Sequence, residues 1–327
     1  MKGTLGGAAL FATVLGLATP LHAVAKTETP AAQKAATKAN GKTTAKKVRG
    51  KVKPATAAAK TVRRAPTMVD GDPGRLALQS SSVLVLDQTT GQALVEKQSD
   101  VVQPIASISK LMTAMVVLDA GLDMQEVISI DEEDVDSLKG TASRLPVGAT
   151  MTRETAMLLA LMSSENRAAH ALGRHYPGGL PAFVQAMNRK AAALGMSNSR
   201  FEEPTGLSSN NVSTAHDLAR MVAAAADYPA IRQFSTTAGA RVELRGRIRD
   251  FNNTNTLVRS DDWEISLSKT GYISEAGRCL VMQAHVAGKP VVIVLLDSNG
   301  KMTRVGDANR IKRWMESASV ASARRSA

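Results

Sequence analysis

The chain has 327 residues, of which 44% are hydrophobic and 3% aromatic, enough apolar sequence to bury one large core or two small ones. Its formal net charge of +12 suggests a nucleic-acid partner, but the first 68 residues hold 13 basic side chains and one acidic one, whereas the remainder holds 28 of each. The globular part is therefore electrically balanced, which excludes a strongly basic binding domain there. The one cysteine, Cys279, excludes a disulfide within the chain and is typical of a buried strand residue.

Residues 1–25 have the features of a secretory signal peptide. Lys2 is followed by an apolar run rich in Gly and Ala over residues 5–21, and Ala23 and Ala25 offer two cleavage points. An uncleaved membrane anchor is the alternative, but the run is short for a span and contains Gly and Pro. We therefore expect export to the periplasm and a mature protein without a transmembrane anchor.

Residues 26–74 are expected to form a disordered basic linker. The segment consists mainly of Ala, Lys, Thr and Pro, so it cannot bury enough apolar surface to offset its ordering entropy. Its composition resembles the tails of DNA-condensing proteins, which makes nucleic-acid binding one alternative. Export argues against that alternative, and we expect no nucleic-acid partner. A flexible tether is the main interpretation, with weak contact to an anionic cell envelope as the second.

The sequence after the linker alternates between strand and helix patterns. Residues 82–87 and 92–97 are apolar runs joined by Thr-Thr-Gly, the pattern of a β-hairpin. A helix is predicted after Pro104, over residues 107–119. Further helices are predicted at residues 152–162, 168–172, 180–194, 214–226 and 302–315, and further strands at residues 127–130, 264–271, 278–287 and 290–297.

This order of elements predicts an α/β fold with an inserted all-α lobe, in which an antiparallel sheet of about five strands is flanked by helices. The final helix is expected to cover one face of the sheet alongside the helix that follows Ser107. The acidic run at residues 131–136 lacks the spacing of a calcium loop and is predicted to be solvated, with no bound metal. The predicted domain covers residues 75–316, with an α/β part at 75–130 and 231–316, a helical lobe at 131–230, and a frayed tail at 317–327.

An S-x-x-K pattern at Ser107 and Lys110 stands where the first helix is predicted to begin. Residues three apart lie on one helical face, so the hydroxyl and the amine can meet. The helix N-terminus adds free N–H groups and a partial positive charge, which favour a developing oxyanion. A serine needs a nearby base to become a nucleophile, and a desolvated lysine can be that base. The alternative is an ordinary helix cap beside a solvated lysine.

Two further short motifs follow in order along the chain. Ser164-Glu165-Asn166 falls between two predicted helices, and Lys269-Thr270-Gly271 ends a predicted strand. With the first motif they make up the S-x-x-K, S-x-N and K-T-G set of penicillin-binding proteins and serine β-lactamases. The likeness extends to the surrounding stretches and to residues 203–207 and 253–259. Over residues 75–316 the chain therefore resembles the low-molecular-mass penicillin-binding proteins, and among them the type-7 D-alanyl-D-alanine endopeptidases.

This resemblance implies an exported serine-type D-alanyl-D-alanine endopeptidase or carboxypeptidase that hydrolyses peptidoglycan peptides through an acyl-enzyme. It also implies inhibition by β-lactams and no cofactor or metal. The implied catalytic residues are Ser107 as the nucleophile, Lys110 as its general base, and Ser164 as the hydroxyl that relays a proton to the leaving amine. The implied substrate-binding residues are Asn166, Lys269, Thr270, Gly271 and Tyr272, and the backbone N–H groups of Ser107 and Tyr272 would form the oxyanion hole.

The role of Lys110 makes a physical demand. A lysine that acts as a base must be largely neutral, although its ordinary pKa is ~10.4. Lowering that pKa by about three pH units costs about 4 kcal/mol. We expect burial and the nearby charge of Lys269 to supply this cost.

Two other functions stay open at this point, and a third is disfavoured. A class A-like β-lactamase would deacylate through a glutamate in an E-x-x-L-N loop; Glu202 and Glu203 fall near the right place, but the residues after them lack that pattern. A non-catalytic envelope- or nucleic-acid-binding protein would use the basic linker as its working part. Zinc-dependent D,D-peptidase chemistry is disfavoured because the five histidines show no ligand spacing.

Overall fold

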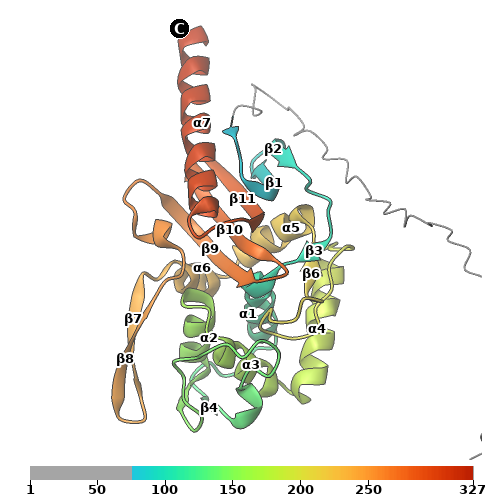
Figure 1. The fold of residues 1–327 in the computed structure, drawn as a ribbon, viewed down its shortest axis with the longest axis vertical. Helices are drawn as coiled ribbons and strands as arrows, with labels where there is room; N and C mark the ends of the chain where they lie inside the picture. Colours follow the sequence, from blue (N-terminus) through green and yellow to red (C-terminus); the bar gives the residue numbers. More distant parts are fainter. Residues whose placement is uncertain (1–75, 327) are drawn as a thin grey trace, which may run out of the picture. The chain divides into compact units, whose positions relative to one another are not determined.

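The computed structural model describes residues 76–326, so the predicted signal peptide and linker lie outside the described residues. At its centre is a five-stranded antiparallel sheet in the order β2-β1-β11-β10-β9 (Figure 1). The predicted sheet of about five antiparallel strands is confirmed. Among residues 76–326, no helix combines the length and the apolar content needed to cross a membrane. The strands are β1 (Ser80–Asp87), β2 (Ala93–Lys97), β9 (Glu264–Ile273), β10 (Gly277–Val286) and β11 (Lys289–Ser298).

Both faces of the sheet are buried, which explains why its central strands are continuous apolar runs. Successive side chains of a strand point to opposite faces. In β1, Val83 and Val85 join the cluster that contains side chains of helix α7 (Thr303–Ser326), whereas Leu84 joins the cluster that contains helix α1 (Ser109–Asp119). The expectation that the first and last helices share one face is therefore wrong, because α1 and α7 lie on opposite faces of the sheet.

The remaining helices fill the face that α1 covers. The helix α1 packs against α2, α3 and α4, while α5 lies against β1, β10 and β11 (Figure 1). One continuous hydrophobic cluster joins these helices to the sheet. The lobe boundaries at residues 131 and 230 stay a prediction, since packing places α1 among the lobe helices and α5 against the sheet. These helices are α2 (Arg153–Met162), α3 (Asn166–Arg174), α4 (Gly179–Ala193), α5 (Ala215–Ala225) and α6 (Pro229–Thr236).

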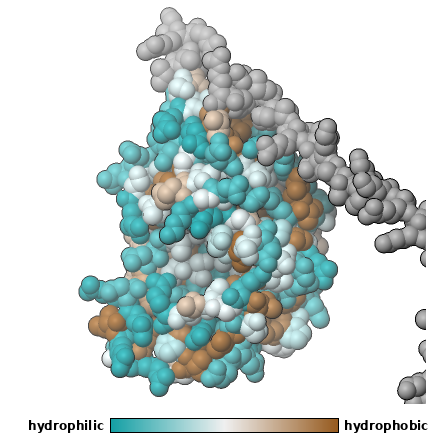
Figure 2. All heavy atoms as spheres, in the orientation of Figure 1, coloured by the Kyte–Doolittle hydropathy of each residue, from teal (hydrophilic) through white to brown (hydrophobic). Residues whose placement is uncertain are grey.

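Local sequence explains where several helices begin. The side chains of Thr152 and Thr214 accept hydrogen bonds from the backbone N–H groups of Thr155 and Asp217, which caps α2 and α5. The helix α1 is buried on all sides from Ser109 to Val117, so it lies inside the core and not on its surface. The outer surface in Figure 2 is mostly hydrophilic, with apolar side chains in separate patches, as expected when the apolar faces pack inward.

Several elements escaped the sequence patterns. These are helix α6 and five of the six strands that form three short antiparallel pairs; the sixth, β4, was predicted. The helix α7 also continues to Ser326 and does not end near residue 315, because the Ala- and Arg-containing sequence after that point favours helix. The pairs are β3 (Gln103–Pro104) with β6 (Val212–Ser213), β4 (Val127–Ser129) with β5 (Thr150–Thr152), and β7 (Gly239–Leu244) with β8 (Arg247–Asn252).

The acidic run at residues 131–136 is not simply solvated, which corrects the prediction for Asp134. This side chain is buried, and its carboxylate contacts His170 Nδ1 at 2.7 Å and accepts a hydrogen bond from Arg174 Nη2 at 2.9 Å. Burial alone would raise the pKa of Asp134, but hydrogen bonds from His170, Arg174 and the Asp131 backbone N–H together hold it below its ordinary value. The carboxylate therefore ties this segment to α3.

Candidate active site

All eight residues predicted to form the site meet around one cleft of about 250 Å³. The cleft lies between the turn before α1, the turn between α2 and α3, and the strand β9. Lys110 and Lys269 are buried and bond to hydroxyls that line it. The six predicted residues that line the cleft directly are Ser107, Ser164, Asn166, Thr270, Gly271 and Tyr272.

Ser107 lies in a short 3₁₀ turn, η2 (Ala106–Ile108), and α1 begins only at Ser109. This is slightly later than predicted, yet Lys110 is still on the first turn of the helix. Lys110 Nζ lies 2.8 Å from Ser107 Oγ, 2.8 Å from Asn166 Oδ1 and 2.6 Å from the Thr205 carbonyl oxygen. As an ammonium it donates to all three, and as a neutral amine it can accept the proton of Ser107. A hydroxyl and a lysine nitrogen are therefore in direct contact, as a serine–lysine pair requires.

The environment of Lys110 favours the neutral amine. Its side chain is 1% exposed, and burial lowers the pKa of Lys110 to about 7, against the carboxylates of Glu203 and Glu165, which raise it. The expected contribution of the Lys269 charge to this shift is wrong, because burial alone lowers the pKa of Lys110. The pKa of Lys269 is itself held well below its ordinary value by burial and by the charges of Lys110 and Arg304.

The second motif forms the turn between α2 and α3. Ser164 has a φ of +61°, in the left-handed region that a serine seldom adopts. Its hydroxyl accepts a hydrogen bond from Lys269 Nζ at 2.9 Å. Asn166 uses both ends of its amide, because Oδ1 accepts from Lys110 and Nδ2 donates to Thr141 Oγ1 at 3.0 Å. The turn thus connects the two lysines.

The third motif lies on β9, which is the last strand of the sheet and so leaves one edge unpaired within it. A Cβ added at Gly271 would lie 3.0 Å from the Ile105 carbonyl oxygen and 3.0 Å from the Ser107 backbone nitrogen. Only a glycine lets the strand pass this close to the nucleophile. Thr270 Oγ1 contacts Thr254 Oγ1 at 2.6 Å, which fixes its hydroxyl at the edge of the cleft.

Comparison with known proteins points to the same chemistry. A family model described as D-alanyl-D-alanine carboxypeptidase, peptidase family S11, matches residues 68–300. The chain belongs to peptidase family S11. It is therefore a serine-type D-alanyl-D-alanine peptidase, and the predicted enzyme class is confirmed.

Individual relatives of this S11 peptidase agree. A D-alanyl-D-alanine endopeptidase of Pseudomonas aeruginosa is 49% identical over 264 residues, which cover 80% of this chain and 85% of the relative. The enzyme of the same name from Escherichia coli is 47% identical over 245 residues, 74% of this chain and 79% of the relative. The crystal structure of the Streptomyces K15 DD-transpeptidase superposes with a TM-score of 0.68 at 27% identity, over 73% of this chain and 97% of that one. The predicted D,D-peptidase fold is confirmed.

Three groups that line the cleft of the S11 peptidase or contact its residues were missed in the sequence. Arg304, at the start of α7, lines the cleft, and its Nη1 donates to the Gly271 carbonyl at 3.1 Å. Thr141 lines the cleft and accepts from Asn166, and the Thr205 carbonyl accepts from Lys110. Arg304 and Thr141 lie outside the three motifs. Thr205 lies in the 203–207 stretch, but a backbone carbonyl carries no signal in residue type. Only Arg304, a cation shortly after the last strand, offered a signal in residue type.

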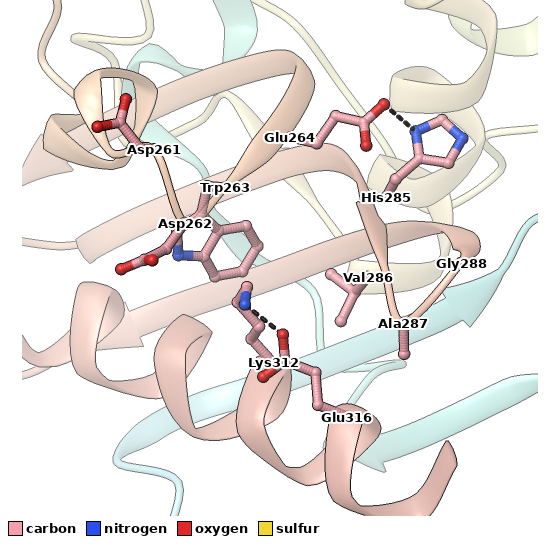
Figure 3. A pocket seen from close by; sticks show the side chains of 10 residues that line it. All are labelled: Asp261, Asp262, Trp263, Glu264, His285, Val286, Ala287, Gly288, Lys312 and Glu316. Atoms are coloured by element: carbon pink, nitrogen blue, oxygen red, sulfur yellow. Dashed lines mark hydrogen bonds and ion pairs between the residues drawn. The ribbon is translucent and has the colours of Figure 1, made fainter. Parts of the chain in front are cut away.

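A larger hollow of the S11 peptidase, about 480 Å³, is lined by none of the eight residues. It lies beside α7, with Trp263 as an aromatic wall and carboxylates around it (Figure 3). His285 Nδ1 pairs with Glu264 at 3.5 Å, and Lys312 pairs with Glu316. It has no serine or cysteine nucleophile in its lining, so the smaller cleft is the candidate active site.

Among the described residues, one group has the ligand types of a metal site. Glu96, Asp100 and His216 bring one ligand atom each within 4.8 Å of one another. His216 Nε2 and Glu96 Oε1 are 2.9 Å apart, the distance of an ordinary ion pair. The group does not include any residue of the cleft.

Proposed function

We propose that this S11 peptidase hydrolyses D-alanyl peptide bonds of peptidoglycan through an acyl-enzyme on Ser107, and that β-lactams inhibit it by acylating the same residue. The observation that carries the proposal is the 2.8 Å contact between Ser107 Oγ and the buried Nζ of Lys110, whose pKa is lowered to about 7. A fully buried lysine with this pKa is neutral in a large fraction of molecules near neutral pH and can accept the serine proton.

Acylation then proceeds in two steps. Lys110 takes the proton of Ser107 as its oxygen attacks the carbonyl carbon of the D-alanyl bond. The backbone N–H groups of Ser107 and Tyr272 stabilise the oxyanion, at about 3 kcal/mol per donor. The C–N bond breaks as Ser164 Oγ, bonded to Lys269, gives its proton to the leaving amine, and the proton that Lys110 took from Ser107 replaces it. Lys110, neutral again, then takes a proton from water as the water oxygen attacks the ester, and passes that proton to Ser107 as the C–O bond breaks.

The strand β9 would bind the substrate as an added strand, because its edge is free within the sheet and Gly271 has no side chain. Lys269, Thr270 and Arg304 supply cationic and hydroxyl groups beside this edge, suited to a substrate carboxylate. Asn166 would hold the peptide backbone on the opposite side. Cleavage of cross-links is favoured over carboxypeptidase action because the Pseudomonas and Escherichia relatives are both endopeptidases by name.

The β-lactamase alternative is not favoured by the geometry. The carboxylate of Glu203 accepts hydrogen bonds from the backbone N–H groups of Thr205 at 2.6 Å and Gly206 at 2.6 Å. Both oxygens are thus committed to holding the loop, so this glutamate does not supply a free base for rapid deacylation. We expect slow release of bound penicillin, and sustained fast turnover of nitrocefin would reverse this choice.

The signal-peptide pattern supports a periplasmic location, and the basic linker would serve as a tether with weak anionic envelope contact. The decisive experiment incubates purified protein with defined muropeptide monomers and cross-linked dimers, beside a Ser107→Ala variant. We expect the wild type to cut the dimers and the variant to be inactive and unlabelled by fluorescent penicillin. Labelling or cleavage by the variant would refute the proposal.

A further inference from the structure

Glu165, the middle residue of the S-x-N turn, has a carboxylate that the proposed mechanism does not use. It occupies the N-cap position of α3, but its side chain makes no capping hydrogen bond. The side chain is instead buried, 6% exposed, and turns toward the loop before β5. There Oε2 accepts from Ser143 Oγ at 2.6 Å and Oε1 accepts from Arg144 Nε at 2.8 Å.

Arg144 is fixed from its other side as well. Its guanidinium carbon lies 4.4 Å from the centroid of the Phe251 ring, a cation–π contact, and Phe251 is buried near the end of β8. Contacts from Phe251 to Arg144 and from Arg144 to Glu165 therefore link the β7–β8 hairpin to the S-x-N turn. We call Ser143, Arg144 and Glu165 the brace.

The turn needs such support because its backbone is strained. Ser164 adopts a φ of +61°, a conformation that is unfavourable for a residue with a Cβ. The Glu165 N–H donates to the Leu159 carbonyl at 3.1 Å, and Lys269 Nζ donates to Ser164 Oγ at 2.9 Å. The brace adds two side-chain bonds at the next residue, and Thr141 adds one at Asn166.

The brace is also electrically placed to act on Lys110. Four charged groups surround Lys110. Glu203 lies in the loop between α4 and β6, Glu165 in the S-x-N turn and Lys269 on β9, and Arg144 lies behind Glu165. Glu165 raises the pKa of Lys110, and the half-exposed Arg144 opposes the Glu165 charge at 2.8 Å. The two members of this ion pair therefore act on Lys110 in opposite directions.

We propose that Glu165 is a positioning residue and that the brace both holds Ser164 and Asn166 in place and sets the pH range in which Lys110 accepts the proton of Ser107. The inference rests on the proposed function of Lys110 as the base. Removing the Glu165 charge favours the neutral amine, so acylation should persist to lower pH. Removing the Arg144 charge leaves Glu165 uncompensated and should confine acylation to higher pH.

The test measures the second-order rate of acylation by a fluorescent penicillin between pH 5 and 9 in full-length protein. We expect Glu165→Gln to move the midpoint of the acid limb down, and Arg144→Met, which keeps an unbranched side chain without the charge, to move it up, each by about 0.5–1 pH unit. Arg241→Gln is the matched control, since Arg241 pairs with Asp250 on the same hairpin at 2.9 Å but is 80% exposed. Its profile should equal that of the wild type.

Opposite shifts would support the proposal, whereas unchanged midpoints with only a lower plateau, or shifts in one direction, would overturn it. If thermal melting shows that Glu165→Gln does not fold, Arg144→Met decides alone: an upward shift supports the brace, and no shift overturns it. A Lys110→Met variant separates the two proposals. Wild-type acylation by that variant overturns the proposed function and the brace together; an inactive Lys110→Met beside unshifted brace variants overturns the brace only.

Discussion

Replacing Gly206 by alanine tests whether the loop behind the nucleophile fixes its position. Gly206 has a φ of +82°, and an added Cβ would lie 1.9 Å from the Ala106 carbonyl oxygen and 2.8 Å from the Ser107 backbone nitrogen. Both contacts are to backbone atoms, so no rotation of a side chain relieves them. Either the loop or the turn η2 must move, and Ser107 moves with the turn.

The magnitude follows from two costs. The left-handed conformation costs a residue with a Cβ about 1–2 kcal/mol, and overpacking adds about 1–3 kcal/mol. We expect Gly206→Ala to lower the free energy of unfolding by about 2–5 kcal/mol. Acylation by fluorescent penicillin should slow by about 100-fold, since small displacements of reacting groups have effects of this size.

Gly195→Ala provides the matched control, because Gly195 has a φ of +70° but nothing lies within 4 Å of an added Cβ. It should lose only about 1–2 kcal/mol and acylate at the wild-type rate. Urea unfolding and stopped-flow labelling measure the two quantities in both variants. Equal stability loss and equal acylation rates in the two variants would refute the steric argument.

Three further predictions concern single side chains. Lys110→Arg keeps a charge that is not lost near neutral pH, so penicillin labelling should disappear, and normal labelling would exclude Lys110 as the base. Burial raises the pKa of the Cys279 thiol to about 11, so a thiol reagent at pH 8 should react only after unfolding; rapid reaction of the folded protein would contradict this burial. Asp134→Asn should lower the free energy of unfolding at pH 7 by about 2–4 kcal/mol, because His170 and Arg174 lose their buried partner. The folded pKa of Asp134 lies below its unfolded value of 3.8, so this stabilisation is present above pH 3.8 and is lost as the pH falls through the folded pKa. The difference in unfolding free energy between wild type and variant, measured with urea, should therefore become smaller in that acidic range; a constant difference would contradict the argument.

The sheet was predictable because its strands are long apolar runs bounded by turns. The same property hid which face each helix covers. In β1 both Val83 and its neighbour Leu84 are apolar, so the strand shows no alternation that would separate the face of α1 from the face of α7. The hairpin β7–β8 was missed for the opposite reason, since it is largely exposed and its polar residues show no buried face.

Within the site, sequence identified side chains in short motifs and missed groups that act from elsewhere. Ser107 and Lys110 are separated by one helical turn, so local geometry suffices to place them together. The Thr205 carbonyl that bonds Lys110 has no residue signature, and Asp134 is buried by partners that lie on α3, far along the chain. Tertiary packing decides these contacts, and a single sequence contains no local pattern for them.

The arrangement of the two lysines indicates how one site can hold both a base and a cation. Lys110 and Lys269 are each 1% exposed, and two buried ammonium groups so close together repel each other. Burial is the main cause of the lowered pKa of Lys269, and Arg304 also lowers it, but when Lys110 is neutral its own repulsion of the Lys269 ammonium disappears and Lys269 retains its proton more readily. Its bonds to Ser164 Oγ and the Thr270 carbonyl then place the positive charge beside β9, where a substrate carboxylate would lie. Loss of the Lys110 proton therefore favours the protonated form of Lys269. The site can then hold a neutral base beside Ser107 and a cation beside the substrate carboxylate at the same time.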